Sequence, residues 1–276
     1  MKLIITQKQS SKLIKEAMGV PKSVDFWVNV LVSLVEDGLL MSLDGGDGGS
    51  LFFGGDEVME KAFSLGWSPD SSGFNELPLV EPSLHINIGV SPEDNIITGD
   101  DYIQGGNFKT QNTGLRGIKF PNGKEATVLT GGEIEITFLM PKEHFDDGSI
   151  VEFFKSDIKP YVESLFFHEL THVVEFYNRT INNKSVPGQE LMWLSAGSES
   201  PKNNLAEWDH LIFLIYLHSS FELNARISEI YGLMKGLKIK TKKEFADFLK
   251  SSRVWSCSND LSDFNAEEYY NDIVIT

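Results

Sequence analysis

The sequence predicts an α+β fold, with a β-containing N-terminal portion at residues 1–150 and a mainly helical portion at residues 151–276. Three observations support this prediction. Apolar and polar residues alternate from Glu133 to Met140, which is typical of a strand with one buried face. Polar residues recur every three or four positions from Val24 to Glu36, which indicates a core helix. From about Ile158 the pattern is mostly helical, and the two portions are also compatible with one continuous domain.

The remaining N-terminal elements follow from local signals. Ser23 is a suitable N-cap for the first helix, and Gly38 is a suitable stop. The stretch from Asp44 to Asp56 contains six glycines, and we expect it to form a flexible loop. Weak alternation predicts a strand from Leu84 to Val90, and Asn122-Gly123 predicts a turn between two later strands.

The C-terminal portion contains several helix signals. Proline is tolerated in the first turn of a helix, so we expect one helix from near Pro160 to about Tyr177. A second is expected from about Leu205 to Leu217, after a polar loop at Ser195 to Asn204. The pattern of a serine or threonine followed three positions later by glutamate marks two further helix starts, at Ser219 to Glu222 and at Thr241 to Glu244.

Composition excludes several classes of protein. The 24 basic and 40 acidic residues give a net charge of -16, which argues against nucleic-acid partners and against docking on anionic lipid. The single cysteine, Cys257, excludes an internal disulfide and any zinc site that needs two or more cysteines. The strongest apolar run, Leu211 to Leu217, is far shorter than the roughly 20 residues that span a bilayer. We expect a cytoplasmic protein with neither a secretion signal nor a membrane partner.

One short motif has chemical meaning. His168 and His172 are four residues apart on the helix that begins near Pro160, so both imidazoles project from one face and can bind the same tetrahedral zinc ion. Glu169 lies about 100° around the helix from His168, where it can act on a water molecule without binding the metal. A chance match to this pattern has a probability of about 0.01 in such a chain. The alternative is a core helix with two incidental histidines.

The run from His168 to Tyr177, HELTHVVEFY, resembles the active-site helix of the zincin metallopeptidases, and especially of the gluzincins. The resemblance covers about ten residues. It implies a zincin-like α+β fold, Zn²⁺ as cofactor, His168 and His172 as metal ligands, and Glu169 as the general base. In these families a glutamate from a later helix is the third ligand.

Several downstream side chains are candidates for that third ligand, namely Glu175, Glu190, Glu199, Glu207, Asp209, His210, His218, Glu222 and Glu229. We favour Glu222 because it begins a strongly periodic helix, and rigid elements hold ligands best. Arg226 lies on the same helix face and could orient a carboxylate. The run ELNAR also resembles the helix of several bacterial and phage HExxH families in which the glutamate is a ligand. Glu229 and His218 remain alternatives, and Glu222 could also act only in the helix cap.

The strand before the motif helix is a candidate for substrate binding. In zincins an edge strand above the cleft pairs with the extended substrate, and this resemblance implies such a role for Gly132 to Phe138. The residues concerned are Glu133, Ile134, Glu135 and Ile136. An ordinary sheet strand is an equally good interpretation.

The leading functional hypothesis is a zinc-dependent hydrolase that cleaves peptide bonds in a peptide or protein substrate. A second hypothesis is a structural or interaction protein of a phage or bacterium, whose zinc site only joins helices or has decayed. It would be virion-associated if a phage encodes it. A third is an intracellular peptidase that cuts one regulatory partner. The sequence does not predict the oligomeric state.

Overall fold

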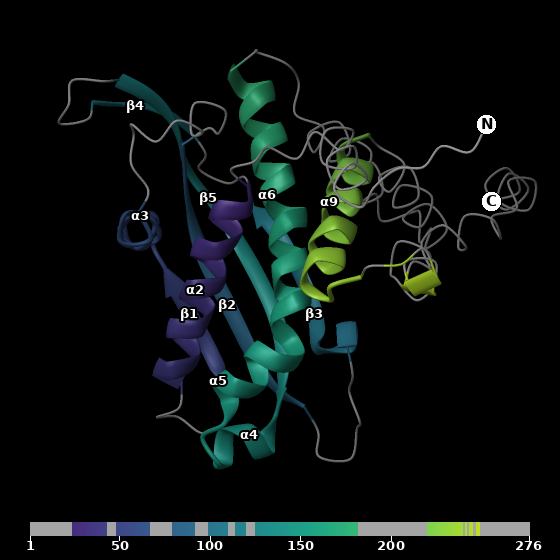
Figure 1. Ribbon diagram of the computed structural model, residues 1–276. Coiled ribbons are helices and arrows are strands. Elements are labelled where there is room, and N and C mark those ends of the chain that lie inside the picture. The colour runs from purple at the N-terminus through teal and green to yellow at the C-terminus, as the bar shows by residue number, and fades with distance from the viewer. Residues whose placement is uncertain are drawn as a thin grey trace, which may run out of the picture.

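The computed structural model describes residues 24–42, 48–66, 79–91, 99–109, 114–119, 125–181 and 220–239, with 241, 243, 244, 247 and 248. These residues form a mixed α+β fold in which helices cover one face of a sheet (Figure 1). The predicted fold class is therefore confirmed at this level. In the described part of the chain, no helix is both long and apolar enough to cross a membrane.

Within the described residues the sheet has five strands, and its central pair is parallel. In chain order the strands are β1 (Gly49–Phe53), β2 (Leu79–Ser91), β3 (Ile103–Lys109), β4 (Gly114–Lys119) and β5 (Glu125–Pro141). The spatial order is β1-β2-β5-β3, and β4 also pairs with β5. The β2–β5 pair is parallel, whereas the other pairs are antiparallel. Strand β5 thus organises the sheet, because it contacts three of the other four strands.

The central position of β5 corrects one prediction. Its predicted alternation is confirmed, since Ile134, Ile136 and Phe138 are fully buried on the face toward the helices. However, β2 pairs with one side of this segment and β3 pairs with the other. The prediction that Gly132 to Phe138 forms an edge strand is therefore wrong, because neither side can accept an added peptide. Strand β3 lies outside it in the sheet.

In the described part of the chain, three long helices lie on one side of the sheet. They are α2 (Val24–Ser42), α6 (Lys159–Ile181) and α9 (Ser220–Gly236). Helices α2 and α6 lie against the sheet, and α9 packs on α6 (Figure 1). The shorter helical segments are α3 (Gly55–Ser64), η2 (Gly99–Tyr102), α4 (Lys142–Asp146), α5 (Ile150–Phe153) and η3 (Phe154–Ile158). The segment η3 has π-helical hydrogen bonding and leads directly into α6.

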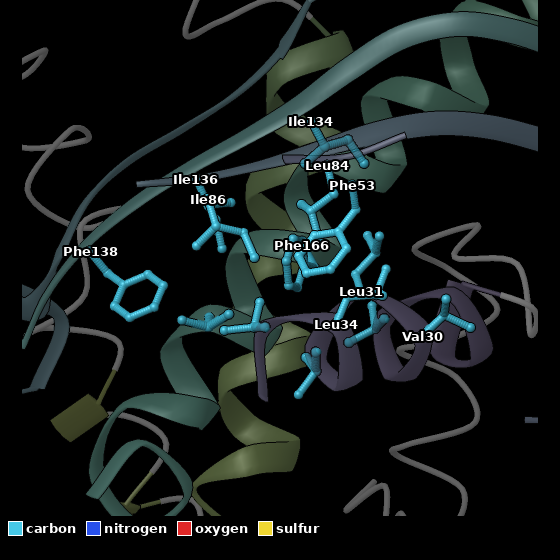
Figure 2. Close-up of a cluster of buried hydrophobic side chains, with 14 of the residues drawn as sticks. Val30, Leu31, Leu34, Phe53, Leu84, Ile86, Ile134, Ile136, Phe138 and Phe166 are labelled. Carbon is cyan, nitrogen blue, oxygen red and sulfur yellow. The ribbon is translucent and has the colours of Figure 1, made fainter. Parts of the chain in front are cut away.

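One hydrophobic core joins the sheet to the helices. Figure 2 shows Ile86 and Ile136 of the sheet pointing toward Phe166 of α6, with Leu31 of α2 alongside. All four side chains are fully buried. The cluster takes side chains from both sides of residue 150. The predicted N-terminal and C-terminal portions therefore share their packing.

Two local predictions in the N-terminal portion are wrong. Helix α2 continues through Gly38 to Ser42 instead of stopping. A Cβ atom at Gly38 would lie 2.6 Å from Leu51 Cδ1, so the glycine lets β1 approach the helix closely. The glycine-rich stretch from Asp44 to Asp56 also contains all of β1 and the start of α3. Tertiary pairing outweighs the local loop signal there.

Some other predictions concern residues near the ends of the described ranges. Thr241 and Glu244 form the predicted reciprocal capping contacts, with backbone-to-side-chain distances of 2.9 and 3.1 Å. Helix α6 includes the predicted start at Pro160 and extends beyond Tyr177. The Asn122-Gly123 turn, the helix at 205–217, His218 and Cys257 lie outside the described residues.

We predict that Phe138→Ala destabilises the protein by about 3–5 kcal/mol, because it leaves a cavity in the middle of the core. The free energy of unfolding from urea titration measures this effect. Phe52→Ala is the matched control, since this side chain is 59% exposed, and we expect a change within about 0.5 kcal/mol. Equal losses in the two variants would contradict the assigned core.

Candidate metal centre

The two histidines of the motif face one another on helix α6. Their Nε2 atoms are 3.1 Å apart, and the two rings are nearly perpendicular. Both side chains are buried. The spacing of four residues on a continuous helix produces this arrangement, because it places the rings one turn apart on the same face.

Helix α9 brings a carboxylate to the same point. Glu222 is completely buried, and its Oε2 lies 3.3 Å from His172 Nε2 while its Oε1 lies 3.7 Å from His168 Nε2. The corners of a tetrahedron are about 3.3 Å apart when each ligand is about 2.0 Å from a zinc ion. The three side chains therefore have the separations that a metal requires, and this buried group could hold a metal ion.

Close packing of α9 on α6 makes this contact between distant segments possible. A Cβ atom at Gly232 would lie 2.8 Å from Ser164 Cα, and one at Gly236 would lie 2.8 Å from Pro160 Cβ. At the other end, Asn224 Nδ2 donates a hydrogen bond to Glu175 Oε1 at 2.7 Å. These contacts show that the helices run antiparallel. The small residues let the backbones approach, so that Glu222 reaches across to the histidines.

Glu169 is a buried acid whose pKa is strongly perturbed. Burial, together with the neighbouring carboxylates, raises its pKa to about 7, although His168 and Arg226 act in the opposite direction. Strand β3 passes directly over it, since a Cβ atom at Gly106 would lie 2.9 Å from Glu169 Oε1. Its carboxyl group therefore lies between the motif helix and Gly106 of β3.

Two further charged side chains of α9 surround the ligands. Arg226 Nε donates a hydrogen bond to Glu222 Oε1 at 2.6 Å, and its Nη1 donates one to Glu229 Oε2 at 3.0 Å. The same Glu229 oxygen lies 3.2 Å from His168 Nδ1. Glu229 therefore contacts the ring nitrogen that faces away from Glu222, which is the usual place for a carboxylate that orients a metal-binding histidine.

These neighbours shift the pKa values of the two histidines differently. Burial lowers the pKa of His168, but Glu229, Glu169 and Glu222 together outweigh it, and the net pKa is raised. For His172, burial is the largest cause and the pKa is lowered, despite the contact with Glu222. His172 is therefore more readily the neutral imidazole that binds a metal.

The charges of the group favour a dication. Glu169, Glu222 and Glu229 are buried and supply three negative charges when ionised, whereas Arg226 supplies one positive charge. With neutral histidines the sum is 1 − 3 = −2 for these residues. Buried charge without compensation is costly, so a divalent cation would relieve an unfavourable balance. Such a cation would also favour the ionised form of Glu169.

The other predicted site residues lie elsewhere or outside the described range. Glu133 and Glu135 are on the opposite face of the sheet from the helices, where Lys109 Nζ contacts both at 2.9 and 2.7 Å. Ile134 and Ile136 are buried in the core. Sequence reasoning missed Gly106, although two successive glycines inside a strand are a signal that another group approaches closely.

We predict that His172→Ala and Glu222→Ala each weaken Zn²⁺ binding by at least about tenfold. Each substitution removes one member of the triangular group formed by His168, His172 and Glu222. Titration of the metal-free protein with Zn²⁺ measures the affinity. Glu175→Gln is the control, since Glu175 follows His172 on α6 but contacts Asn224. Wild-type affinity in Glu222→Ala would exclude Glu222 as a ligand.

We also predict that Gly232→Ala lowers stability by about 1–3 kcal/mol and weakens Zn²⁺ binding, because the added methyl group pushes α9 away from α6. Chemical unfolding and the same titration measure the two effects. Gly49→Ala serves as control, since a Cβ atom there meets nothing within 4 Å. Unchanged stability in Gly232→Ala would contradict the close packing of the helices.

Comparisons with protein-family models, with curated proteins and with solved structures found no match for this chain. The resemblance of HELTHVVEFY to the zincin helix therefore remains a resemblance of sequence pattern. The structure adds that His168 and His172 meet Glu222 in space.

Proposed function

We propose that this chain is a zinc-dependent hydrolase that cleaves peptide bonds, with a zincin-like arrangement of helix and sheet. One observation carries the proposal: a buried His-His-Glu group lies beside a fourth side chain, Glu169, whose pKa is raised. Two imidazoles and one carboxylate suit Zn²⁺ and leave one coordination position open. A zinc ion bound there would supply a Lewis acid and lower the pKa of a water molecule to about 7.

In this proposal Glu169 moves the proton. Its carboxylate is adjacent to His168 in sequence but is not part of the triangular group. An ionised carboxylate beside the metal can accept a proton from water and then donate it to the leaving amine. His168, His172 and Glu222 bind, whereas Glu169 acts as base and then as acid. This division of roles is supported by the geometry, because His168, His172 and Glu222 converge on one point and Glu169 is not part of that group.

Strand β3 is the element best placed to bind the substrate backbone. Within the described residues, its side away from β5 has no strand partner. Gly106 lies over Glu169, and no side chain at this position separates the strand from the acid. An extended peptide that pairs with β3 would place its backbone close to Glu169. We therefore propose β3, in place of β5, as the strand that binds substrate.

A structural metal site is the second candidate, and one observation favours it. His168, His172, Glu169 and Glu222 are all at most 5% exposed, whereas a catalytic centre must admit its substrate. Under this alternative the metal joins α6 to α9 in a structural or interaction protein. Binding of a small hydroxamate separates the alternatives, because it requires an open coordination position.

We predict that Glu169→Gln retains Zn²⁺ but reduces peptide hydrolysis by roughly 10²- to 10⁴-fold, because the amide cannot accept the proton. Cleavage of unfolded casein and of a quenched fluorescent peptide library measures the activity. Glu163→Gln on the same helix is the control; it also replaces an acid whose burial raises its pKa, and we expect near wild-type rates.

Three outcomes are distinguishable in this experiment. Wild-type protein that binds Zn²⁺ but neither binds hydroxamate nor cleaves peptides would identify a structural site. Hydroxamate binding without cleavage of these substrates would indicate a peptidase restricted to one partner. Full activity in Glu169→Gln would exclude Glu169 as the base.

A further inference from the structure

Arg226 connects two side chains that define the metal centre. Its Nε contacts Glu222 and its Nη1 contacts Glu229, which in turn contacts His168. We propose that Arg226 is a positioning residue that restricts Glu222 to binding the metal through Oε2 alone and thereby keeps one coordination position open. This inference rests on the proposed function, since it assumes that the group holds a divalent metal.

The geometry at Glu222 supports this restriction. Its two oxygens have different partners: Oε1 accepts the 2.6 Å hydrogen bond from Arg226, whereas Oε2 lies 3.3 Å from His172 Nε2. A carboxylate that binds a metal through both oxygens must turn both toward it. That rotation would compete with a short, charge-assisted hydrogen bond on a buried acid.

The position of Arg226 on α9 makes one guanidinium contact both acids. Glu222 precedes it by four residues and Glu229 follows it by three, so all three side chains share one helix face. The planar guanidinium presents several donors in fixed directions, which a lysine cannot reproduce. Arg226 can therefore hold Glu222 directly and His168 through Glu229.

Loss of Arg226 has a defined consequence in this account. Glu222 would be able to present both oxygens, and the number of protein atoms around the metal would rise. Fewer coordination positions of the metal would then remain for water or substrate. The positive charge of Arg226 would also no longer offset the negative charge of the ligand.

Co²⁺ substitution tests the proposal without relying on activity. Four-coordinate Co²⁺ absorbs visible light much more strongly than five- or six-coordinate Co²⁺. We expect intense bands from the wild type and markedly weaker bands from Arg226→Gln. We expect the same weakening from Arg226→Lys, which keeps the positive charge but lacks the two separate donor groups of the guanidinium.

Two control variants locate the effect. Lys235→Gln removes a positive charge from the other end of α9, where Lys235 pairs with Asp25, and we expect the wild-type spectrum. Glu229→Gln replaces the charged partner of His168 with a neutral amide but leaves the Arg226–Glu222 hydrogen bond, so we expect intense bands with weaker affinity. Weak bands in Glu229→Gln would instead assign the effect to His168 and overturn the proposed role at Glu222.

The remaining outcomes separate this inference from the proposed function. A wild type that binds neither Co²⁺ nor Zn²⁺ overturns both. A wild type that binds Co²⁺ in a four-coordinate site, with an unchanged spectrum in Arg226→Gln and Arg226→Lys, overturns only the role of Arg226. Circular dichroism of each variant checks that it folds, and Arg226→Lys provides the test if Arg226→Gln does not.

Discussion

The close contact between α6 and α9 is the constraint on which the candidate site depends. Glu222 lies about fifty residues after His172 in the chain, and only the packing of the two helices places it beside the histidines. Small residues at the contact allow this approach, since Gly232 meets the backbone of Ser164. The sheet supports the arrangement from the other side, because α6 shares one core with β2 and β5. The site thus forms where a core helix meets both a second helix and the edge of a sheet.

The candidate site contains an unusual concentration of buried charged side chains. Three acids and one arginine are gathered where water is largely excluded, and such a cluster is costly unless its members contact one another or a cation. Arg226 contacts two of these acids, because it donates hydrogen bonds to both Glu222 and Glu229. Arg226 therefore orients both Glu222 and Glu229, and such support is a condition for a site with defined geometry.

Features encoded locally could be predicted from the sequence, whereas features set by pairing could not. The alternation in β5 and the spacing of His168 and His172 depend on adjacent residues and were readable directly. Whether β5 lies at an edge depends on distant strands, and the alternation is the same in either position. A glycine at position 38 is typical of a helix end, but here it lies inside α2 and leaves space for the side chain of Leu51. Glu222 is predictable as a ligand only from helix periodicity combined with a resemblance, because its proximity to the histidines is not visible in the sequence.

The candidate ligands come from two different helices, and this has a thermodynamic consequence. A cation that contacts both helices binds the docked state and not the separated one, so occupancy and docking become a single linked equilibrium. A free metal concentration one hundred times the dissociation constant would add about 2.7 kcal/mol to the docked state. The association of α9 with the rest of the fold would then report the metal supply around the protein. Loss of the metal would remove this contribution, and the contact between α6 and α9 would then depend on packing and on direct hydrogen bonds alone.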